Sequence, residues 1–411
     1  MRLRTQFWNS FVGTKVDIMN FLGTPAGTYT TGDGSVLRSY PQKNTEEFRT
    51  LCRLLEAQGW ACITRYAENG SGFATYRKGN ELYHFYIPAD RSDTLRVAHS
   101  DSANLPEDPG PATGNCETAV VQLQLPLTEE NGYANGMGYV VRLSDGSFLI
   151  FDGGYAEQAD QLWQTLVKLH GSEDGIVIRA WCLTHAHGDH YRILAPFAEK
   201  YAGRLTLERF LAVPVNSADA ADPFFNNSLP NVLARYAGAV LTVPHTGMRF
   251  RFADLTLEIL YTADEHLIDG KPEGLDFNST GTVYRLFNER DSMLFLGDAM
   301  NDVTTRLTAI WGDHLKSNLV QVAHHGVGNS PAEFYEFLEP AVLLYPAGNL
   351  LYYGPNHDFG KTKQFATNWT RNGAVRKALE ESGNYVILLH DEHAYLHIWG
   401  SGNETQIFTL E

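Results

Sequence analysis

The segment from Thr184 to His190, with the sequence Thr-His-Ala-His-Gly-Asp-His, constrains this chain more than any other. It places four side chains that can bind a metal, three imidazoles and one carboxylate, within six positions. An apolar, strand-like run, residues 176–183, comes directly before it. Neutral imidazoles and carboxylates suit zinc and similar first-row cations. We therefore expect a metal site at the end of this strand.

Size and charge narrow the class of protein. The 411 residues exceed one average domain, so we expect one large domain and a smaller one. A hydrophobic fraction of 43% with 19% charged residues is typical of a folded globular protein. The formal net charge of −16 argues against a nucleic-acid-binding surface, because that affinity comes mainly from Lys and Arg that neutralise phosphates. The cysteines, Cys52, Cys62, Cys116 and Cys182, form no C-x-x-C pair and require no disulfide.

The sequence contains no pattern of a membrane or export segment. Asn9, Lys15 and Asp17 interrupt the apolar stretch that a signal peptide needs. No uncharged apolar run approaches the roughly 18 residues of a transmembrane helix. We therefore expect a cytoplasmic protein without a membrane span, whose partner is a small-molecule or ester substrate. Assembly into a homo-oligomer stays open.

The chain divides by composition into three parts. Residues 1–100 predict a small α+β domain, because a helical face formed by Phe48, Leu51, Leu54 and Leu55 precedes several short strands. Residues 101–114 are rich in proline, glycine and acids and predict a linker. Residues 115–411 alternate strands with helices. The strands expected in the two domains include 61–66, 72–76, 82–87, 95–97, 119–125, 138–143, 147–151, 176–183, 210–215, 240–243, 255–260, 282–286, 293–296, 319–322, 342–345, 385–389 and 394–398.

Three further motifs follow strand-like runs. Asp152-Gly153-Gly154 comes after the strand 147–151. Leu294-Phe295-Leu296-Gly297-Asp298 is a strand that ends in Gly-Asp, and Val322-Ala323-His324-His325-Gly326 is a later strand that ends in two histidines. An ordinary turn at a strand end is the plainer interpretation of each motif taken alone. Together with the histidine cluster, they indicate a second set of metal-binding groups.

These motifs resemble those of the metallo-β-lactamase-fold hydrolase superfamily, from about Cys116 to the C-terminus. The resemblance implies an α/β fold with four layers, an αββα sandwich, preceded here by the small N-terminal α+β domain. It also implies two divalent metal ions, zinc first with manganese or iron as alternatives. A hydroxide that bridges the two ions would be the nucleophile, so no dedicated side-chain base is needed.

The spacing and the resemblance together assign most of the metal ligands. His185 and His187 are two residues apart and can reach one metal, while Asp189 and His190 turn toward the second. Asp298 matches the superfamily's bridging aspartate, and such a carboxylate suits cations about 3.5–4 Å apart. Asp189 is also expected to act in catalysis, by steering the proton of the hydroxide.

The assignment of the remaining histidines stays open. One of His324 and His325 binds metal, and the other orients it or meets substrate. His266 follows the strand 255–260, about where the superfamily has a further histidine, and is either a ligand or a surface-loop residue. No Pro-Gly-His-Thr-like segment is present to settle this. His245 lies in a turn expected far from the metals, and we interpret it as structural.

A narrower resemblance concerns the last metal-binding strand. Its His-His-Gly ending is similar to a branch that includes the hydrolase domain of bacterial DNA-uptake channel proteins and a choline-phosphate esterase. That branch often lacks the additional histidine. The segment 353–357, Tyr-Gly-Pro-Asn-His, resembles an element that lies across the active site of that branch. There His357 would protonate a leaving group or hold a phosphate; a structural loop histidine is the alternative.

Three functions are consistent with these features. The first is hydrolysis of a phosphodiester or other phosphate ester by a dinuclear metal site. The second is hydrolysis of a carboxylic ester, thioester, lactone or β-lactam, against which the absence of the Pro-Gly-His segment argues. The third is a binding protein that keeps the fold without turnover. For the N-terminal domain, we consider a wall of the substrate cleft, a dimerisation surface or a substrate-recognition element.

Overall fold

The fold is taken from a computed structural model of the chain. The residues that it describes are 18–100, 118–123, 135–214, 228–268, 276–289, 291–326, 330–340, 342–344, 346, 384–390, 393–399 and 405–409. The expected linker at 101–114 and His357 lie outside these ranges. Within them, no helix combines the length and the apolar character needed to cross a membrane.

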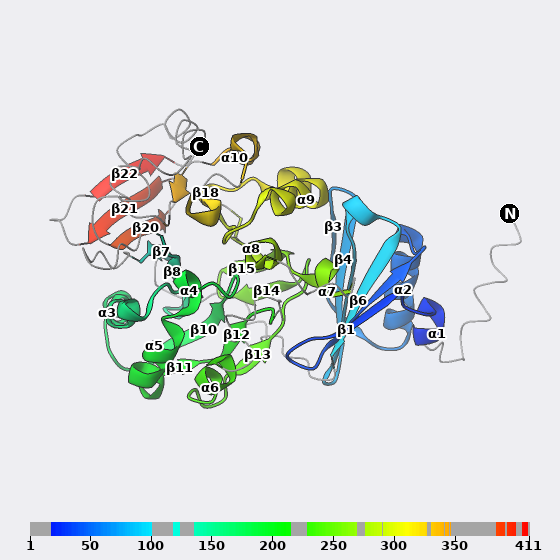
Figure 1. Cartoon of the computed structure of the whole chain (residues 1–411), viewed down its shortest axis with the longest axis horizontal. Coiled ribbons are helices and arrows are strands. Elements are labelled where there is room, and N and C mark those ends of the chain that lie inside the picture. Colours follow the sequence, from blue (N-terminus) through cyan, green and yellow to red (C-terminus); the bar gives the residue numbers. More distant parts are fainter. Residues whose placement is uncertain are drawn as a thin grey trace, which may run out of the picture.

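The N-terminal part is one antiparallel sheet with a helix against it. The sheet has six strands in the order β1-β2-β6-β5-β4-β3 (Figure 1). Helix α2 buries Phe48, Leu51 and Leu55 against the sheet, as their helical spacing predicts. The side chain of Asn44 caps the first turn of α2, and the Glu47 carboxylate accepts a hydrogen bond from Asn44 N. The elements are α1 (Ile18–Leu22), β1 (Gly27–Thr30), β2 (Val36–Pro41), α2 (Thr45–Ala57), β3 (Ala61–Glu68), β4 (Ser71–Lys78), β5 (Glu81–Ile87) and β6 (Thr94–Ser100).

The larger part begins with a sheet of ten strands, in the order β13-β12-β10-β9-β8-β7-β20-β21-β22 with β11 beside β10. Strands β9, β10 and β12 run parallel, so their carboxyl ends share one edge of the sheet. The strands of this sheet are β7 (Ala119–Gln122), β8 (Gly138–Arg142), β9 (Phe148–Asp152), β10 (Ile176–Cys182), β11 (Leu205–Leu207), β12 (Arg209–Leu211), β13 (Val240–Thr242), β20 (Asn384–His390), β21 (His393–Trp399) and β22 (Thr405–Thr409).

A second sheet of six strands, in the order β14-β15-β16-β17-β18-β19, lies against the first. Side chains from the two sheets meet in one core, where the rings of Phe151 and Phe295 stack with centroids 3.8 Å apart. The strands are β14 (Arg249–Phe252), β15 (Leu255–Tyr261), β16 (Val283–Phe287), β17 (Ser292–Phe295), β18 (Leu319–Gln321) and β19 (Val342–Leu344).

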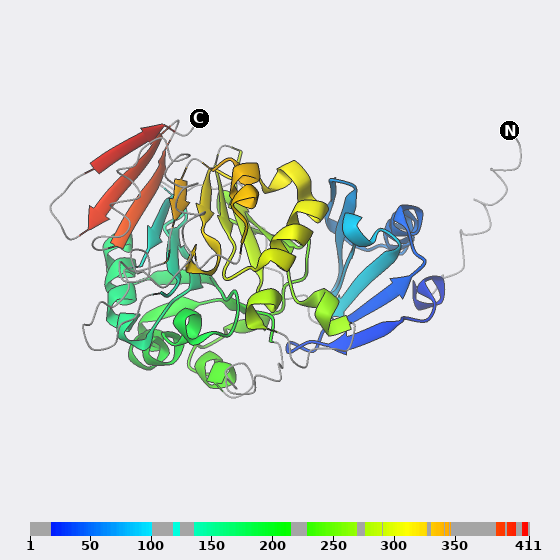
Figure 2. The same cartoon turned by 45° about the horizontal axis from the view of Figure 1, so that its top comes forward.

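Helices cover the outer face of each of these two sheets. On the first sheet, Val140, Phe148 and Ile150 alternate with the inward residues and pack against α3, α5 and α6. On the second sheet, Leu294 and Val320 pack against α9 and α10. The result is the expected αββα sandwich, and Figure 2 shows its layers from another side. The helices are α3 (Ala159–His170), α4 (Gly188–Tyr191), α5 (Leu194–Tyr201), α6 (Leu229–Leu233), α7 (Asp264–Ile268), α8 (Phe277–Thr280), α9 (Asn301–Trp311) and α10 (Ala332–Leu338).

The N-terminal sheet packs closely against the turn before β14 and against α9. The rings of Phe73 and Trp311 stack with centroids 4.6 Å apart, and the Tyr66 hydroxyl donates to Gly247 O at 2.8 Å. Gly247 has a φ of +89°, and a Cβ there would lie 1.9 Å from the Phe73 ring. Only glycine therefore permits this approach of the two parts.

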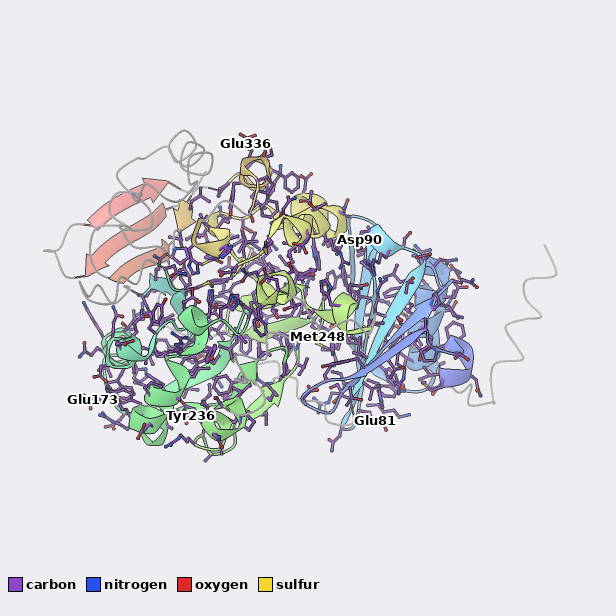
Figure 3. All side chains as sticks on the ribbon, viewed as in Figure 1. Glu81, Asp90, Glu173, Tyr236, Met248 and Glu336 are labelled. Atoms are coloured by element: carbon purple, nitrogen blue, oxygen red, sulfur yellow. The ribbon has the colours of Figure 1, made fainter. Side chains whose placement is uncertain are left out.

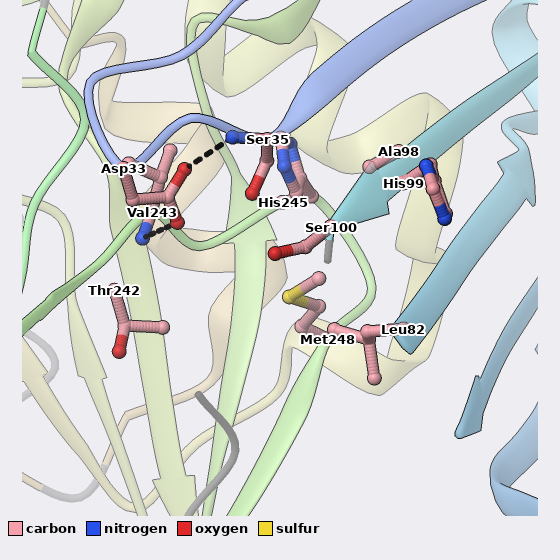
Figure 4. A pocket seen from close by; sticks show the side chains of 10 residues that line it. All are labelled: Asp33, Ser35, Leu82, Ala98, His99, Ser100, Thr242, Val243, His245 and Met248. Carbon is pink, nitrogen blue, oxygen red and sulfur yellow. Dashed lines mark hydrogen bonds between the residues drawn. The ribbon is translucent and has the colours of Figure 1, made fainter. Parts of the chain in front are cut away.

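A small pocket lies beside this contact and is lined by both parts of the chain (Figure 4). Asp33 of the β1–β2 turn forms one side, where its carboxylate accepts from Ser35 N at 3.0 Å and from Val243 N at 3.0 Å. His245 also lines the pocket, and its Nδ1 bonds Asp264 Oδ1 at 2.9 Å. His245 is thus a buried, bonded residue of the contact between domains, in keeping with the structural role inferred for it.

The contact contains a buried histidine that predicts acid sensitivity. His84 accepts from the Thr75 hydroxyl at Nδ1 and donates from Nε2 to Thr246 O, both at 2.9 Å. Burial lowers the pKa of His84 to about 3, against a smaller opposing effect of the bond to Thr246. The native state therefore keeps this imidazole neutral, while the unfolded chain protonates it below about pH 6.5.

Stability is accordingly expected to fall as the pH decreases from about 6.5 toward 3, by up to about 1.4 kcal/mol per pH unit from this group. His84→Gln should flatten this part of the profile, measured by denaturant unfolding between pH 7 and 4. The same substitution at the partly exposed His170 is the control. An unchanged slope in the His84 variant would show that this imidazole is not the acid-sensitive group.

Candidate metal centre

The histidine loop is held by a carboxylate from the neighbouring strand. Strands β9 and β10 pair in parallel, with Phe151 opposite Cys182, so Asp152 ends β9 beside the loop that follows β10. Its carboxylate, which is fully buried, accepts from Thr184 N and from the Thr184 hydroxyl, both at 2.7 Å. The loop therefore starts from one defined position.

The same carboxylate orients two histidines. His190 Nδ1 lies 2.8 Å from Asp152 Oδ2, so Nδ1 carries the proton and Nε2 presents its lone pair to the other side. His185 Nδ1 lies 2.9 Å from the Thr184 hydroxyl, and this hydroxyl donates its hydrogen bond to Asp152. Asp152 thus fixes the ring orientation of both His185 and His190.

Asp298 reaches the loop through a tight turn after β17. Gly297 has a φ of +55°, and a Cβ there would lie 2.9 Å from the Thr184 side chain. The buried Gln321 amide accepts from Gly297 N at 2.8 Å and donates to Gly297 O at 3.0 Å. These contacts bring the Asp298 carboxylate to 3.2 Å from His190 Nε2 and 3.6 Å from His185 Nε2.

The two adjacent histidines after β18 have unusual backbone angles. His324 and His325 both have positive φ, 49° and 54°, which is uncommon for residues other than glycine. His325 donates from Nδ1 to Pro346 O at 2.8 Å. Its Nε2 then lies 3.1 Å from Asp189 Oδ2 and 3.4 Å from Asp298 Oδ2. The kinked backbone directs His325 into the cluster.

The described residues contain two groups that can hold a metal ion. One consists of Asp189, His190, Asp298 and His325, and the other of His185, His187 and Asp298. Within each group the ligand atoms lie within 4.8 Å of one another. Asp298 belongs to both groups, which is the arrangement expected for a bridging carboxylate.

The donor atoms fit divalent metal ions. Three buried atoms in the cluster, His190 Nε2, His325 Nε2 and Asp298 Oδ1, lie close to one another or to Asp189 but form no hydrogen bond of good geometry with any described residue. Buried polar atoms are rarely left unpaired, so unpaired atoms that converge on one point indicate a ligand. Imidazole nitrogen combined with carboxylate oxygen suits zinc, iron or manganese.

Electrostatics in the cluster favour cations. Burial raises the pKa of Asp298, but the imidazoles of His325, His190 and His185 outweigh burial and hold this pKa well below its usual range. Burial lowers the pKa of His325, but Asp298 and Asp189 outweigh burial and raise it to about 9. The carboxylates thus attract positive charge, and protons compete with metal for the same nitrogen atoms.

A family comparison agrees with this geometry. Residues 134–327 match the model described as the metallo-beta-lactamase superfamily. This part, which is less than half of the 411 residues, is similar to the metallo-β-lactamase superfamily. Members of the superfamily are metal-dependent hydrolases or related enzymes, so this chain is an enzyme of that class. The superfamily and the fold expected from the motifs are therefore confirmed.

Solved structures of this fold are similar at low identity. The metallo-β-lactamase-fold protein YhfI from Bacillus subtilis is 11% identical, covering 62% of this chain and 94% of YhfI, with a TM-score of 0.37. CmlA, a diiron β-hydroxylase from Streptomyces venezuelae, is 15% identical, covering 67% of this chain and 54% of CmlA, with a TM-score of 0.39. Zinc-bound PqqB from Methylobacterium extorquens is 10% identical, covering 50% of this chain and 70% of PqqB, with a TM-score of 0.29. No curated protein matches the chain in sequence.

The structure distinguishes the histidines whose role the sequence left open. His324 is outside both groups, with Nε2 3.9 Å from Asp298 Oδ2 and its side chain 23% exposed. His266 belongs to neither group of described residues; its Nε2 bonds the Tyr261 hydroxyl at 3.1 Å. His325 is therefore the candidate ligand of the His-His pair, and His266 is turned toward other contacts.

Three further residues support the centre without belonging to either ligand group. Asn135 donates from Nδ2 to Asp189 Oδ2 at 2.7 Å, Gln321 binds the Gly297 turn, and the Phe277 ring packs edge-on against His187 at 5.4 Å. Asn135 precedes β8 at the edge of the sheet where β9 ends at Asp152, and that position was the available signal.

The orienting role of Asp152 predicts a loss of metal affinity. Asp152→Asn removes the carboxylate oxygen that accepts from both Thr184 and His190. Loss of a partner that orients a ligand typically lowers metal affinity about 10–100-fold. We expect about that loss in zinc affinity, measured by competition with a chromogenic chelator. Asp145→Asn, at the turn before the same strand, is the control. Equal affinity in both variants would contradict the role of Asp152.

The two adjacent histidines predict different metal contents. His325→Ala should lower the bound zinc from two ions to about one per chain, because its group loses a ligand. His324→Ala should keep both ions and change only turnover. Elemental analysis of the two variants, purified in parallel, distinguishes them. Loss of metal in His324→Ala alone would reverse the assignment.

Proposed function

We propose that this chain is a dinuclear metal-dependent hydrolase that cleaves a phosphodiester or another phosphate ester. The proposal rests on the two groups of candidate ligands that share Asp298. Among the described residues, the group with His185 and His187 contains no third histidine. A metal with three protein ligands keeps a position for water or substrate. Such an open position suits a phosphoryl oxygen.

The ligand assignment follows from the same two groups. His185, His187 and Asp298 would hold one ion, and Asp189, His190, Asp298 and His325 the other. Zinc is the first choice, with manganese or iron as alternatives. When bound, two such ions would lower the pKa of a coordinated water from about 15.7 toward 7 and would neutralise charge on the reacting ester.

Asp189 is the group proposed to steer the proton of the attacking water. Burial raises the pKa of Asp189, but His190 and His325 outweigh burial and lower it, so the carboxylate is ionised at neutral pH. Asn135 and His325 both contact Oδ2, which holds the carboxylate in one orientation. An oriented, ionised carboxylate can accept a hydrogen bond from the attacking water and so steer its proton, while the lowered pKa makes Asp189 a weak base.

His324 and His357 are the proposed substrate-side groups. The partly exposed His324 lies beside Asp298 without belonging to a ligand group, so it can contact an ester oxygen at the open side. His357, outside the described residues, is the proposed donor of a proton to the leaving group. The His-His-Gly likeness to a branch with phosphate-ester hydrolases supports the same substrate class.

Replacing the shared carboxylate tests the proposed function. Asp298→Ala removes a ligand from both groups, so hydrolysis of bis-(p-nitrophenyl) phosphate should fall more than about 100-fold, beyond the range typical for outer partners. Asp302→Ala, an exposed carboxylate close by on α9, is the control. Activity retained by Asp298→Ala would contradict the assignment.

A substrate panel with the zinc- or manganese-loaded enzyme distinguishes the ester classes. Cleavage of the phosphodiester without cleavage of nitrocefin, thioesters or lactones is the expected result. The reverse preference would favour the carboxylic-ester alternative. Less than one tightly bound metal ion per chain after metal-replete expression would remove the dinuclear proposal and favour a binding protein.

A further inference from the structure

Helix α7, which follows β15, lies beside the N-terminal sheet (Figures 1 and 2). Two adjacent carboxylates of α7 bind it to the N-terminal domain. Glu265 accepts from Arg96 Nη2 at 2.7 Å, and its second oxygen lies 2.6 Å from Arg96 Nε. Arg91 adds a contact at 2.9 Å. The Arg96 and Glu265 side chains are only 1% and 8% exposed. A buried guanidinium paired through two nitrogens fixes both position and angle.

The neighbouring residue of α7 makes a second buried contact. Asp264 accepts from the Tyr86 hydroxyl of β5 at 2.9 Å, while its other oxygen bonds His245. Both Tyr86 and Asp264 are buried. Helix α7 is only five residues long, so these bonds to the N-terminal domain define where it lies.

Tyr261, the last residue of β15, links α7 to the helix beside the metal ligands. Its hydroxyl donates a hydrogen bond to Ser279 O of α8 at 3.1 Å and forms a second hydrogen bond with His266 Nε2 at the same distance. The hydroxyl has one proton, so His266 is the donor in the second bond. His266 thus joins α7 to α8 through Tyr261.

Helix α8 carries this link to one group of candidate ligands. Its Phe277 ring contacts the His187 ring at 5.4 Å, nearly perpendicular. Just after α8, Thr282 N donates to Thr184 O at 2.8 Å. The contacts from the N-terminal domain therefore end at the group formed by His185 and His187.

A second route from the N-terminal domain reaches the same tyrosine. Asp90 accepts from Arg306 Nε at 2.9 Å, and the Arg306 guanidinium faces the Tyr261 ring at 5.7 Å. Figure 3 shows Asp90 where the N-terminal sheet approaches α9. Tyr261 is thus supported from two sides by the N-terminal domain.

The other ligand group is supported within the catalytic domain. His190 is oriented by Asp152, His325 by Pro346 O, and Asp189 by Asn135. None of these contacts involves the described residues of the N-terminal domain. A change in the domain contact should therefore affect the two groups unequally.

We propose that the N-terminal domain is a working part of the active site, which fixes α7 and α8 beside the His185–His187 metal position. Glu265 and Tyr261 are positioning residues: they act through α8 and touch no ligand. The inference rests on the proposed function only for the effect on turnover. Its effect on metal binding can be measured without any substrate.

The experiment measures the two zinc affinities of the full-length chain by chelator competition. Glu265→Gln keeps the shape of the side chain and removes its charge. We expect about tenfold weaker binding at one site and wild-type affinity at the other, the lower end of the 10–100-fold range for outer partners. Glu56→Gln is the control, because Glu56 also pairs with an arginine, Arg65 at 2.7 Å, but does so within the N-terminal domain.

Tyr261→Phe is the second variant, in case Glu265→Gln does not fold. It removes only the hydroxyl that joins His266 to Ser279 and should weaken the same single site. Tyr236→Phe is its control, since the buried Tyr236 hydroxyl has no hydrogen-bond partner among the residues that the structure describes. Tyr236 lies on the side of the catalytic domain away from the N-terminal sheet (Figure 3).

With zinc saturating, both test variants should raise the KM for bis-(p-nitrophenyl) phosphate more than they lower kcat. A lower melting temperature with both zinc affinities and KM unchanged would overturn the proposal, because the domain would then contribute only stability. Equal weakening of both sites would also overturn it. The two proposals can fail separately. If the wild type cleaves no phosphodiester, the proposed function fails; if Glu265→Gln still binds zinc more weakly at one site only, this inference stands.

Discussion

A buried carboxylate at the end of β9 is the interaction on which the metal centre depends. Asp152 is wholly removed from solvent, and burial raises its pKa, with His190 and Thr184 offsetting part of that increase. Burying such a group is costly unless it is well hydrogen-bonded. Here its three partners are the loop backbone, the Thr184 hydroxyl and His190. The hydrogen bonds that stabilise the buried Asp152 carboxylate thus also orient His185 in one ligand group and His190 in the other.

The rest of the centre follows from strand ends that meet at one edge. Strands β9 and β10 run parallel in one sheet, and β17 and β18 run parallel in the other. Their carboxyl ends deliver Asp152, the histidine loop, Asp298 and His325. Each turn beyond a strand is held by a specific contact, such as the Gln321 amide on Gly297. The two packed sheets form a rigid base, and the ligands extend from it by only a few residues.

The N-terminal domain is attached by buried charged groups as well as by aromatic stacking. Removing one member of a buried ion pair such as Arg96 and Glu265 typically costs about 3–5 kcal/mol, because the other charge is left unpaired. A contact of this kind favours one relative position of the two domains. The position is relevant because His266 of α7 bonds the Tyr261 hydroxyl, which in turn bonds Ser279 O of α8. Helix α8 also carries Phe277, whose ring contacts His187. Domain attachment and ligand geometry are therefore physically connected.

The sequence by itself indicated a metal site, because four possible ligands follow one apolar run. The resemblance of its strand-end motifs to the superfamily implied the sandwich and the place of Asp298. Local periodicity also predicted α2 and the strands from β3 to β6. It did not predict β1, β2, β11, β14 or β22, which are short or lack a clear alternating pattern. Only the tertiary structure decided that His325 and not His324 joins a ligand group, because two positive φ angles set their directions. It also placed His266 beside Tyr261. The helix that carries His266 is positioned by the bond between Glu265 and Arg96, and a local sequence pattern cannot predict a contact between residues 169 positions apart.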